Sequence, residues 1–442
     1  MTRRRSLGLL VLAIAVFAAA VVVRMVFQPG PTGFAPGDRV ALAAYPGPSP
    51  AGVPASLASA NVVKRGEYLI AAADCAACHT VKGDTPFAGG RAFKLPFGTI
   101  FTPNITPDRA TGIGAWSDAE FVRAVRQGIG RGGERLYPAF PYASYAMLSE
   151  PDILAIKAYL FSLKPVRRAT KPNTFAFPFN QRWLMAVWSG LFNRTGEFRP
   201  VLSQSAAWNR GAYLVEAAGH CGECHTPRNL MQAMNQHDKF GGGVAEGWHA
   251  YNISGDPASG LGRWSQAELA TYLRTGSSPG RGTASGPMAE VVALSTSRLD
   301  PADVQAMALY LKSVPAHPDS ALPAVRATPA TAAPVAAENA AGRRTFEGAC
   351  ASCHAWSGAG PLRGEAQLTG SRAINDPSGV NVARMILSGT GPRPAGKPYM
   401  PGFATTYSDR EIADVANYVT SRFGATASRL KAADIARFRR DQ

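Results

Sequence analysis

Three copies of one five-residue motif constrain this chain more than any other feature of its sequence. All six cysteines of the 442-residue chain belong to these copies. Two thiols spaced Cys-x-x-Cys lie on one helical turn, where each can form a thioether to a haem vinyl group, and the following histidine can bind the iron. The motifs therefore predict three covalent haem c groups, attached through Cys75 and Cys78, Cys221 and Cys224, and Cys350 and Cys353, with His79, His225 and His354 as iron ligands.

Two other uses of paired cysteines explain the sequence less well. A structural zinc site needs four ligands, so cysteine pairs far apart in the sequence would have to meet. A thiol-redox site is typical of a thioredoxin-like βαβ context, which is absent here, and it leaves the three histidines unexplained. We therefore favour haem over zinc or thiol chemistry.

Each motif lies in a longer repeat. Arg65–Leu69 precedes the first motif and Arg210–Leu214 precedes the second, with nearly the same sequence. After these motifs, an asparagine is followed twelve positions later by a tryptophan, and a Ser-x-x-Glu capping box then predicts the start of a helix. We expect the matched side chains to contact the haem edge, with a purely structural role as the alternative: Asn104, Trp116, Asn252 and Trp264.

The third repeat is shorter and lacks this Asn-to-Trp insert. All three repeats nevertheless end in a helical pattern of apolar residues that closes on a tyrosine. An N-capping side chain precedes each of these helices, and the three caps with their tyrosines are Ser149 and Tyr159, Asp300 and Tyr310, and Ser408 and Tyr418. The pattern predicts one terminal helix for each repeat.

A haem iron that transfers electrons commonly takes methionine as its second axial ligand, because the thioether raises the reduction potential. The candidate must lie between the motif and the terminal helix. The best placed residues are Met147, Met288 and Met400. Packing in the core is the alternative for any methionine, and ligation by two histidines is a competing scheme that could apply to one haem at most.

Composition and charge limit the partners. The formal net charge is +16, which fits an anionic membrane surface, an acidic protein or nucleic acid. The sequence has no nucleic-acid-binding motif, so we expect membrane lipid or protein and no nucleic acid. Apolar residues from Leu7 to Val23 follow a basic cluster, which predicts a membrane anchor that leaves the rest of the chain exported; a cleaved signal peptide is the alternative.

The organisation predicted along the chain is an anchor or signal, then haem domains joined by linkers. The segment around Trp183–Phe192 is too short to span a bilayer and is either an interdomain helix or a docking surface. The predicted boundaries are: anchor 1–27, Pro/Ala linker 28–60, domain one 61–175, hydrophobic connector 176–205, domain two 206–317, Ala/Pro linker 318–338, domain three 339–425, basic tail 426–442. We expect the third domain to be positioned semi-independently and the tail to be a solvated helix.

Several segments together resemble the triple-haem cytochrome c subunit of membrane-bound bacterial dehydrogenases. Besides the three motifs they are Lys64–Leu69, Phe87–Arg91, Thr102–Thr106, Leu136–Tyr142, Arg210–Leu214 and Gly286–Glu290. The resemblance covers roughly residues 60–425. It implies a mainly α protein of three tandem class I cytochrome c domains, in each of which the terminal helices cross. Such subunits commonly hold to the membrane by a C-terminal amphipathic element, so the N-terminal membrane anchor predicted here is a departure from the family.

The resemblance also implies a role. Such subunits accept electrons from a catalytic dehydrogenase subunit of quinoprotein, flavin or molybdenum type, with a small third subunit in some complexes. They pass the electrons to ubiquinone or a terminal oxidase at the inner (cytoplasmic) membrane, with the haem domains in the periplasm. We therefore expect an electron-transfer subunit without a catalytic site of its own. A stand-alone membrane-anchored shuttle that feeds a terminal oxidase is the alternative, and a haem-based sensor or peroxidase is a rival of another class.

Overall fold

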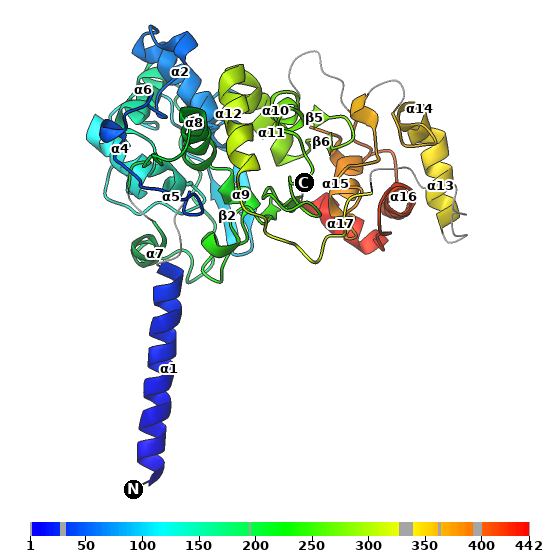
Figure 1. Ribbon diagram of the computed structural model, residues 1–442, viewed down its shortest axis with the longest axis horizontal. Coiled ribbons are helices and arrows are strands. Elements are labelled where there is room, and N and C mark those ends of the chain that lie inside the picture. The colour runs from blue at the N-terminus through cyan, green and yellow to red at the C-terminus, as the bar shows by residue number, and fades with distance from the viewer. Residues whose placement is uncertain are drawn as a thin grey trace.

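The computed structural model describes residues 2–26, 32–193, 196–326, 339–360, 364–391 and 400–441. The described chain is mainly helical, as the sequence predicts (Figure 1). Its strands form three small antiparallel hairpins: β1 (Ala92–Leu95) with β2 (Gly98–Phe101), β3 (Gly243–Ala245) with β4 (Trp248–Ala250), and β5 (Ser277–Ser278) with β6 (Gly282–Thr283).

A crossed pair of helices recurs in each of the three repeats. A glycine lies at each crossing because the partner helix leaves no room for a side chain. A Cβ added to Gly66 would lie 1.9 Å from the carbonyl oxygen of Ala155, and the matching approaches are 1.9 Å at Gly211 and 2.1 Å at Gly342. The pairs are α2 (Val62–Ala72) with α6 (Glu150–Ser162), α8 (Ala206–Tyr213) with α12 (Pro301–Lys312), and α13 (Ala340–Thr345) with α16 (Asp409–Phe423).

Local capping explains where these and neighbouring helices begin. Ser149, Asp300 and Ser408 cap α6, α12 and α16 as predicted. Each side chain accepts a hydrogen bond from a backbone N–H that has no partner within the helix. The two predicted capping boxes also form, and they open α4 (Asp118–Gln127) and α10 (Gln266–Thr275).

Short helices carry the three motifs and the segments between them. The motif helices are α3 (Cys75–His79), α9 (Gly222–His225) and α14 (Ala351–His354). A π-helical turn leads into the second and third motifs, at η3 (Leu214–Ala218) and η7 (Phe346–Cys350). The remaining α-helices are α1 (Thr2–Val26), α5 (Tyr142–Tyr145), α7 (Leu184–Phe192), α11 (Pro287–Leu294), α15 (Val380–Ser388) and α17 (Ala432–Arg440), and the 3₁₀ turns are η1 (Leu42–Ala44), η2 (Ala55–Leu57), η4 (Gln236–Asp238), η5 (Thr296–Arg298) and η8 (Gly364–Ala366).

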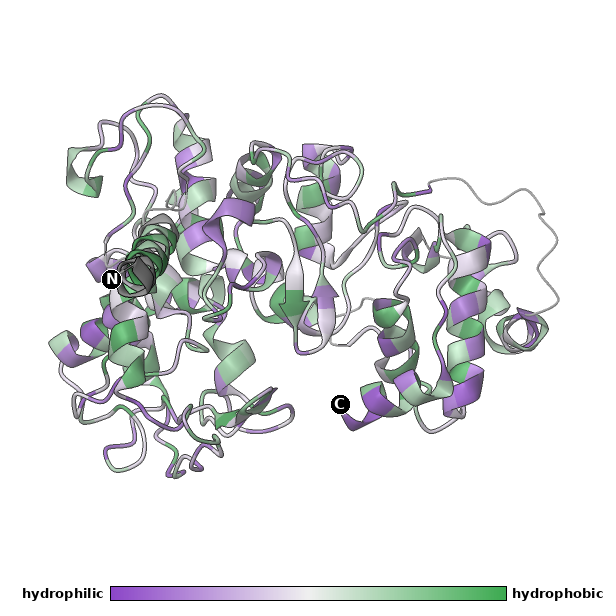
Figure 2. Ribbon diagram, turned by 90° about the horizontal axis from the view of Figure 1, so that it is seen from below, coloured by the Kyte–Doolittle hydropathy of each residue, from purple (hydrophilic) through white to green (hydrophobic). Residues whose placement is uncertain are grey.

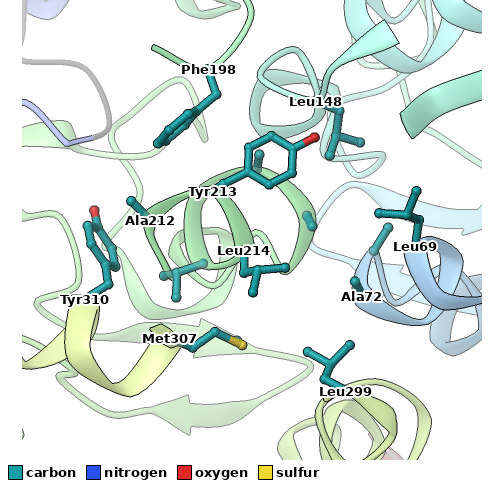
Figure 3. Packing of buried hydrophobic residues seen from close by; sticks show 14 of the residues in the cluster. Leu69, Ala72, Leu148, Phe198, Ala212, Tyr213, Leu214, Leu299, Met307 and Tyr310 are labelled. Carbon is teal, nitrogen blue, oxygen red and sulfur yellow. The ribbon is translucent and has the colours of Figure 1, made fainter. Parts of the chain in front are cut away.

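The first two repeats share one hydrophobic core. Leu69 and Leu148 from the first repeat belong to the same buried cluster as Tyr213, Leu214 and Met307 from the second (Figure 3). The third repeat has a separate buried cluster of its own, built around α16. Burial therefore joins repeats one and two more closely than the predicted division into independent domains implies.

The third repeat nevertheless packs against the second. Gly370 of the third repeat lies against Gly280 of the second, since a Cβ added to Gly370 would lie 2.1 Å from the Gly280 carbonyl oxygen. Helix α15 also contacts strand β4. The expected semi-independent position is therefore wrong, because direct contacts place the repeat. Residues 327–338 of the predicted Ala/Pro linker lie outside the described residues.

The two ends of the chain differ from expectation in different ways. Helix α1 stands apart from the body of the molecule beside α7 (Figure 1), and it is seen end-on as an apolar helix in Figure 2. Within the described residues, no helix has the length and hydropathy that crossing a membrane requires, so the predicted anchor is not confirmed. The tail is not a solvated helix, because α17 buries Ile435 and Phe438 in the core of the third repeat.

Candidate haem-attachment sites

The first motif begins directly after the crossed helix α2. Helix α2 ends at Ala72, and Asp74 takes a left-handed backbone conformation with φ of 50° that turns the chain into α3. Cys75 and Cys78 then lie one helical turn apart, and His79 ends the helix. This is the local geometry that two thioethers and one iron ligand on a single haem require.

All three motif histidines make the same hydrogen bond. Nδ1 of His79 lies 2.8 Å from the carbonyl oxygen of Pro103. The matching distances are 2.6 Å from His225 to Tyr251 and 2.6 Å from His354 to Ala366. A carbonyl can only accept, so Nδ1 carries the proton and Nε2 keeps its lone pair for a metal. The residues present therefore fit an iron ligand in each motif.

Burial shifts the pKa values of the histidines and cysteines in the motifs. It lowers the pKa of His79, His225 and His354, against the raising effect of the carbonyl bond, so the imidazoles are neutral. Burial also raises the pKa of Cys78 and Cys221 to about 12.

The cysteines form neither disulfides nor a metal-binding cluster in the described part of the chain. All six lie among the described residues, and none of them forms a disulfide. The same part of the chain contains no group of three or more His, Cys, Asp or Glu side chains placed to hold a metal ion. The cysteines are thus free for covalent attachment.

The candidate methionines are all half-buried. Met147 lines a cavity between the first two repeats that Gly222 and Glu223 of the second motif also line. Helix α11, which carries Met288, contacts α3 of the first motif. Met400 packs against the core of the third repeat, within that repeat. The structure thus places Met147 near the second motif and the helix that carries Met288 near the first, and the axial pairing stays a prediction.

The matched asparagines hold loops together within the protein. The side-chain amide of Asn104 donates to the carbonyl of Val166 at 2.7 Å, and that of Asn252 donates to the carbonyl of His317 at 2.6 Å. Both asparagines are buried. Each ties the loop after its motif to the segment after the terminal helix, which is the structural alternative for these residues; their contact with haem stays a prediction.

The matched tryptophans are half-buried. Trp116 accepts a hydrogen bond at its backbone oxygen from Lys157 at 2.9 Å. The Trp264 ring lies edge-on to Tyr272 and under the guanidinium of Arg281. Their expected role at the haem edge is likewise still a prediction.

Cross-repeat contacts around the motifs are the feature that the sequence did not reveal. The Tyr145 hydroxyl donates to the carbonyl of Ala73 at 2.6 Å, and the Tyr145 ring packs edge-on to His220, with centroids 5.3 Å apart. Arg91 bonds the Ala77 carbonyl of the first motif and pairs with Glu290 of the second repeat at 2.6 Å. No spacing signal could have found the contacts of Tyr145 with His220 and of Arg91 with Glu290, because each joins positions far apart in the sequence.

Comparison with known proteins agrees with this geometry. The family model for cytochrome c matches residues 63–164 and 339–422, so fold and site define a cytochrome c. The chain is 45% identical to a nicotinate dehydrogenase subunit of Pseudomonas putida over 377 residues, which is 83% of this chain and 31% of that protein. It therefore spans about a third of the length of that relative.

Two other relatives match along most of their own length. The gluconate 2-dehydrogenase cytochrome c subunit of Pantoea cypripedii is 38% identical, over 86% of this chain and 90% of that subunit. The cytochrome c subunit of alcohol dehydrogenase (quinone) of Gluconacetobacter polyoxogenes is 35% identical, over 86% and 85%. The chain therefore belongs to the cytochrome c subunits of dehydrogenases, and it is an electron carrier rather than a catalytic subunit.

Proposed function

We propose that this chain carries one covalent haem c at each of its three motifs. The observation that carries the proposal is the histidine Nδ1 bond to a backbone carbonyl, which has the same form in all three. The crossed helix pair beside each motif supports the same assignment. The proposed axial pairs are His79 with Met147, His225 with Met288, and His354 with Met400.

The protein side chains hold and orient the group, and haem supplies one-electron redox chemistry when bound. Each cysteine pair contributes two thioether bonds from one helical turn. Each histidine is held in a single orientation by its carbonyl bond, which also raises the basicity of Nε2. The cysteines and histidines of the motifs are half-buried, apart from the exposed Cys353, and low polarity around an iron site is one of the means by which a protein sets its potential.

The electrons would enter from a catalytic dehydrogenase subunit of quinoprotein, flavin or molybdenum type. They would leave to ubiquinone or a terminal oxidase. The relatives support the first step because each of the three is named as part of a dehydrogenase, and one of them is named for quinone. A small third subunit is a further proposed partner.

The proposed location is the periplasmic face of the inner membrane. An exposed apolar patch at one end of the molecule supports contact with lipid. Phe177, Trp183 and Val187 are 78%, 65% and 54% exposed, and Leu230 is 94% exposed. The Trp188 indole donates to the carbonyl of Met231 at 2.8 Å, which holds the Leu230 loop beside α7, and α7 also contacts the apolar helix α1.

Vesicle flotation tests the patch. The full chain should float with vesicles that contain anionic lipid, and the W183S/L230S variant should float less. The matched control is Val62→Ser, which removes an equally apolar and 53% exposed side chain on α2. Equal flotation of all three proteins would refute the lipid-facing patch.

Haem content and co-purification test the function. Three haems per chain by pyridine haemochrome, and haem-bearing peptides around Cys75, Cys221 and Cys350 by mass spectrometry, are the expected results. A tag on this chain should recover a catalytic subunit in fixed ratio after mild detergent extraction, and cofactor analysis of that subunit then distinguishes the three types. Recovery of the chain alone, or only with a terminal oxidase, would favour the stand-alone shuttle.

A further inference from the structure

The carbonyl that orients His225 lies on a short hairpin of the second repeat. This carbonyl belongs to Tyr251, which directly follows strand β4. Strand β4 pairs with β3, and β3 contacts the motif helix α9. The position of β4 therefore sets the position of the hydrogen-bond acceptor for His225.

The third repeat holds the same segment through its backbone. The side-chain amide of Asn381 donates to the carbonyl oxygen of His249 at 2.9 Å, and Oδ1 of Asn381 accepts from the N–H of His249, also at 2.9 Å. Asn381 lies near the start of α15, the helix that contacts β4. This pair of hydrogen bonds resembles one rung of a β-ladder, and it ties the strand to the third repeat.

Asp376 of the third repeat holds the segment through its side chains. Its Oδ2 accepts from the Tyr251 hydroxyl at 3.0 Å and lies 2.9 Å from Nδ1 of His249. The Asp376 side chain is only 2% exposed, so these bonds compete little with water and are strong. Tyr251 therefore connects the two residues: its hydroxyl bonds Asp376, and its backbone carbonyl bonds His225.

The acceptor residues of the other two motifs lack a side chain that could make such a bond. Their acceptors are the carbonyls of Pro103 and Ala366. Neither side chain has a polar atom, so neither residue can be anchored to another repeat by its own side chain. Among the described residues, only the second motif has an acceptor residue whose own side chain bonds another repeat. The third motif is linked differently, because the Thr283 hydroxyl of the second repeat donates to the Glu365 carbonyl beside Ala366 at 3.2 Å.

We propose that Asp376 and Asn381 are positioning residues for the second haem, and that docking of the third repeat sets the reduction potential of that haem. The inference rests on the proposed haem at Cys221 and Cys224. A firm carbonyl bond to Nδ1 makes the imidazole a stronger donor, which favours ferric iron and lowers the potential. Loosening the segment that carries Tyr251 should therefore raise the potential.

Optical redox titration of the purified full chain tests this. Tyr251→Phe keeps the carbonyl and removes the hydroxyl, and Asp376→Asn keeps the size and removes the charge. Each substitution should raise the reduction potential of one haem by up to about 59 mV, which corresponds to a tenfold change in a one-electron equilibrium constant. The potentials of the other two haems should not change. Tyr137→Phe is the matched control, because it removes a hydroxyl bond to the Phe179 carbonyl at 3.0 Å away from the motifs.

Two further measurements separate the outcomes. The Y251F/D376N double variant should shift the potential less than the sum of the single shifts, because both residues act on one path. Asn381→Ala, which removes both side-chain bonds to the His249 backbone, should raise the potential of the same haem. Three haems with unchanged potentials, or an equal shift in the Tyr137 control, would overturn the inference. Absence of haem from the Cys221 peptide would instead overturn the proposed function.

Discussion

The Tyr213 hydroxyl of the second repeat donates a hydrogen bond of 2.6 Å to the buried carboxylate of Asp152 in the first. The reciprocal pair also forms, because the Tyr68 hydroxyl of the first repeat donates to Asp303 of the second. In each repeat the tyrosine lies on the first crossed helix and the aspartate near the start of the other. The two repeats therefore meet through an approximately two-fold arrangement of equivalent residues.

This pair predicts unequal effects of two equivalent substitutions. Asp303 also receives two bonds from the Arg210 guanidinium, whereas the remaining partner of the Asp152 carboxylate is the N–H of Gly52 at 2.8 Å. Tyr213→Phe should cost about 1–3 kcal/mol of unfolding free energy, because it removes one donor from a buried carboxylate. Tyr68→Phe should cost less. Thermal unfolding followed by circular dichroism measures both, and a larger loss in Tyr68→Phe would contradict the argument.

A buried ion pair in the second repeat predicts a large loss from a single change. Lys239 pairs with Glu216, whose side chain is 2% exposed and also accepts from the Tyr310 hydroxyl. Lys239→Met should cost about 3–5 kcal/mol, because it leaves a buried carboxylate without its cation. The K239M/E216L double variant should recover most of that loss. Denaturant unfolding of both variants checks this, and equal stability of the two would show that the lone charge is not the cause.

The crossing glycines predict a steric effect. Gly211→Ala would place a Cβ 1.9 Å from the Ala306 carbonyl oxygen, so the helices must separate. We expect a loss of about 1–3 kcal/mol or more. The control is Gly190→Ala in α7, where nothing lies within 4 Å of the added Cβ and alanine favours the helix by about 1 kcal/mol. Equal loss in both variants, measured by thermal unfolding, would exclude the crossing as the cause.

The proposed methionine ligands predict three separate spectroscopic changes. Met147→Leu, Met288→Leu and Met400→Leu should each abolish the methionine-to-iron charge-transfer absorption of one ferric haem and lower its potential, because the thioether raises the potential. Leucine keeps the volume, so folding should survive. Met307→Leu is the control, since this residue is buried in the core on α12. Near-infrared spectra decide each case, and an unchanged spectrum removes that methionine from the ligand set.

Local features were predictable to the residue. The capping boxes at Ser117 and Ser265 and the caps at Ser149 and Ser408 form as expected, because a cap depends on side chains within one helical turn of the backbone that they bond. The motif helices are local in the same way.

The errors lie in long-range packing. The sequence predicts a solvated tail and a semi-independent third repeat, yet Ile435 is fully buried and Asp376 bonds the second repeat. A helix with one apolar stripe has the same sequence pattern whether or not a partner covers that stripe. Composition alone therefore could not predict these contacts.

The contrast between the first two repeats is partly visible in the sequence. Pro103 and Tyr251 precede the matched asparagines Asn104 and Asn252. Tyr251 has a hydroxyl that Pro103 lacks, but the sequence does not show which residue that hydroxyl bonds. The structure identifies that residue as Asp376.

The sequence by itself determined the chemistry: three pairs of thiols with an adjoining histidine, and the helices that begin and end each repeat. These depend on spacing along the chain, which covalent geometry and helical pitch translate directly into position. The tertiary structure alone decided that repeats one and two share a core through Tyr213 and Asp152, and that the third repeat holds the segment that orients His225. Such contacts depend on the summed packing of distant segments, which no local pattern encodes.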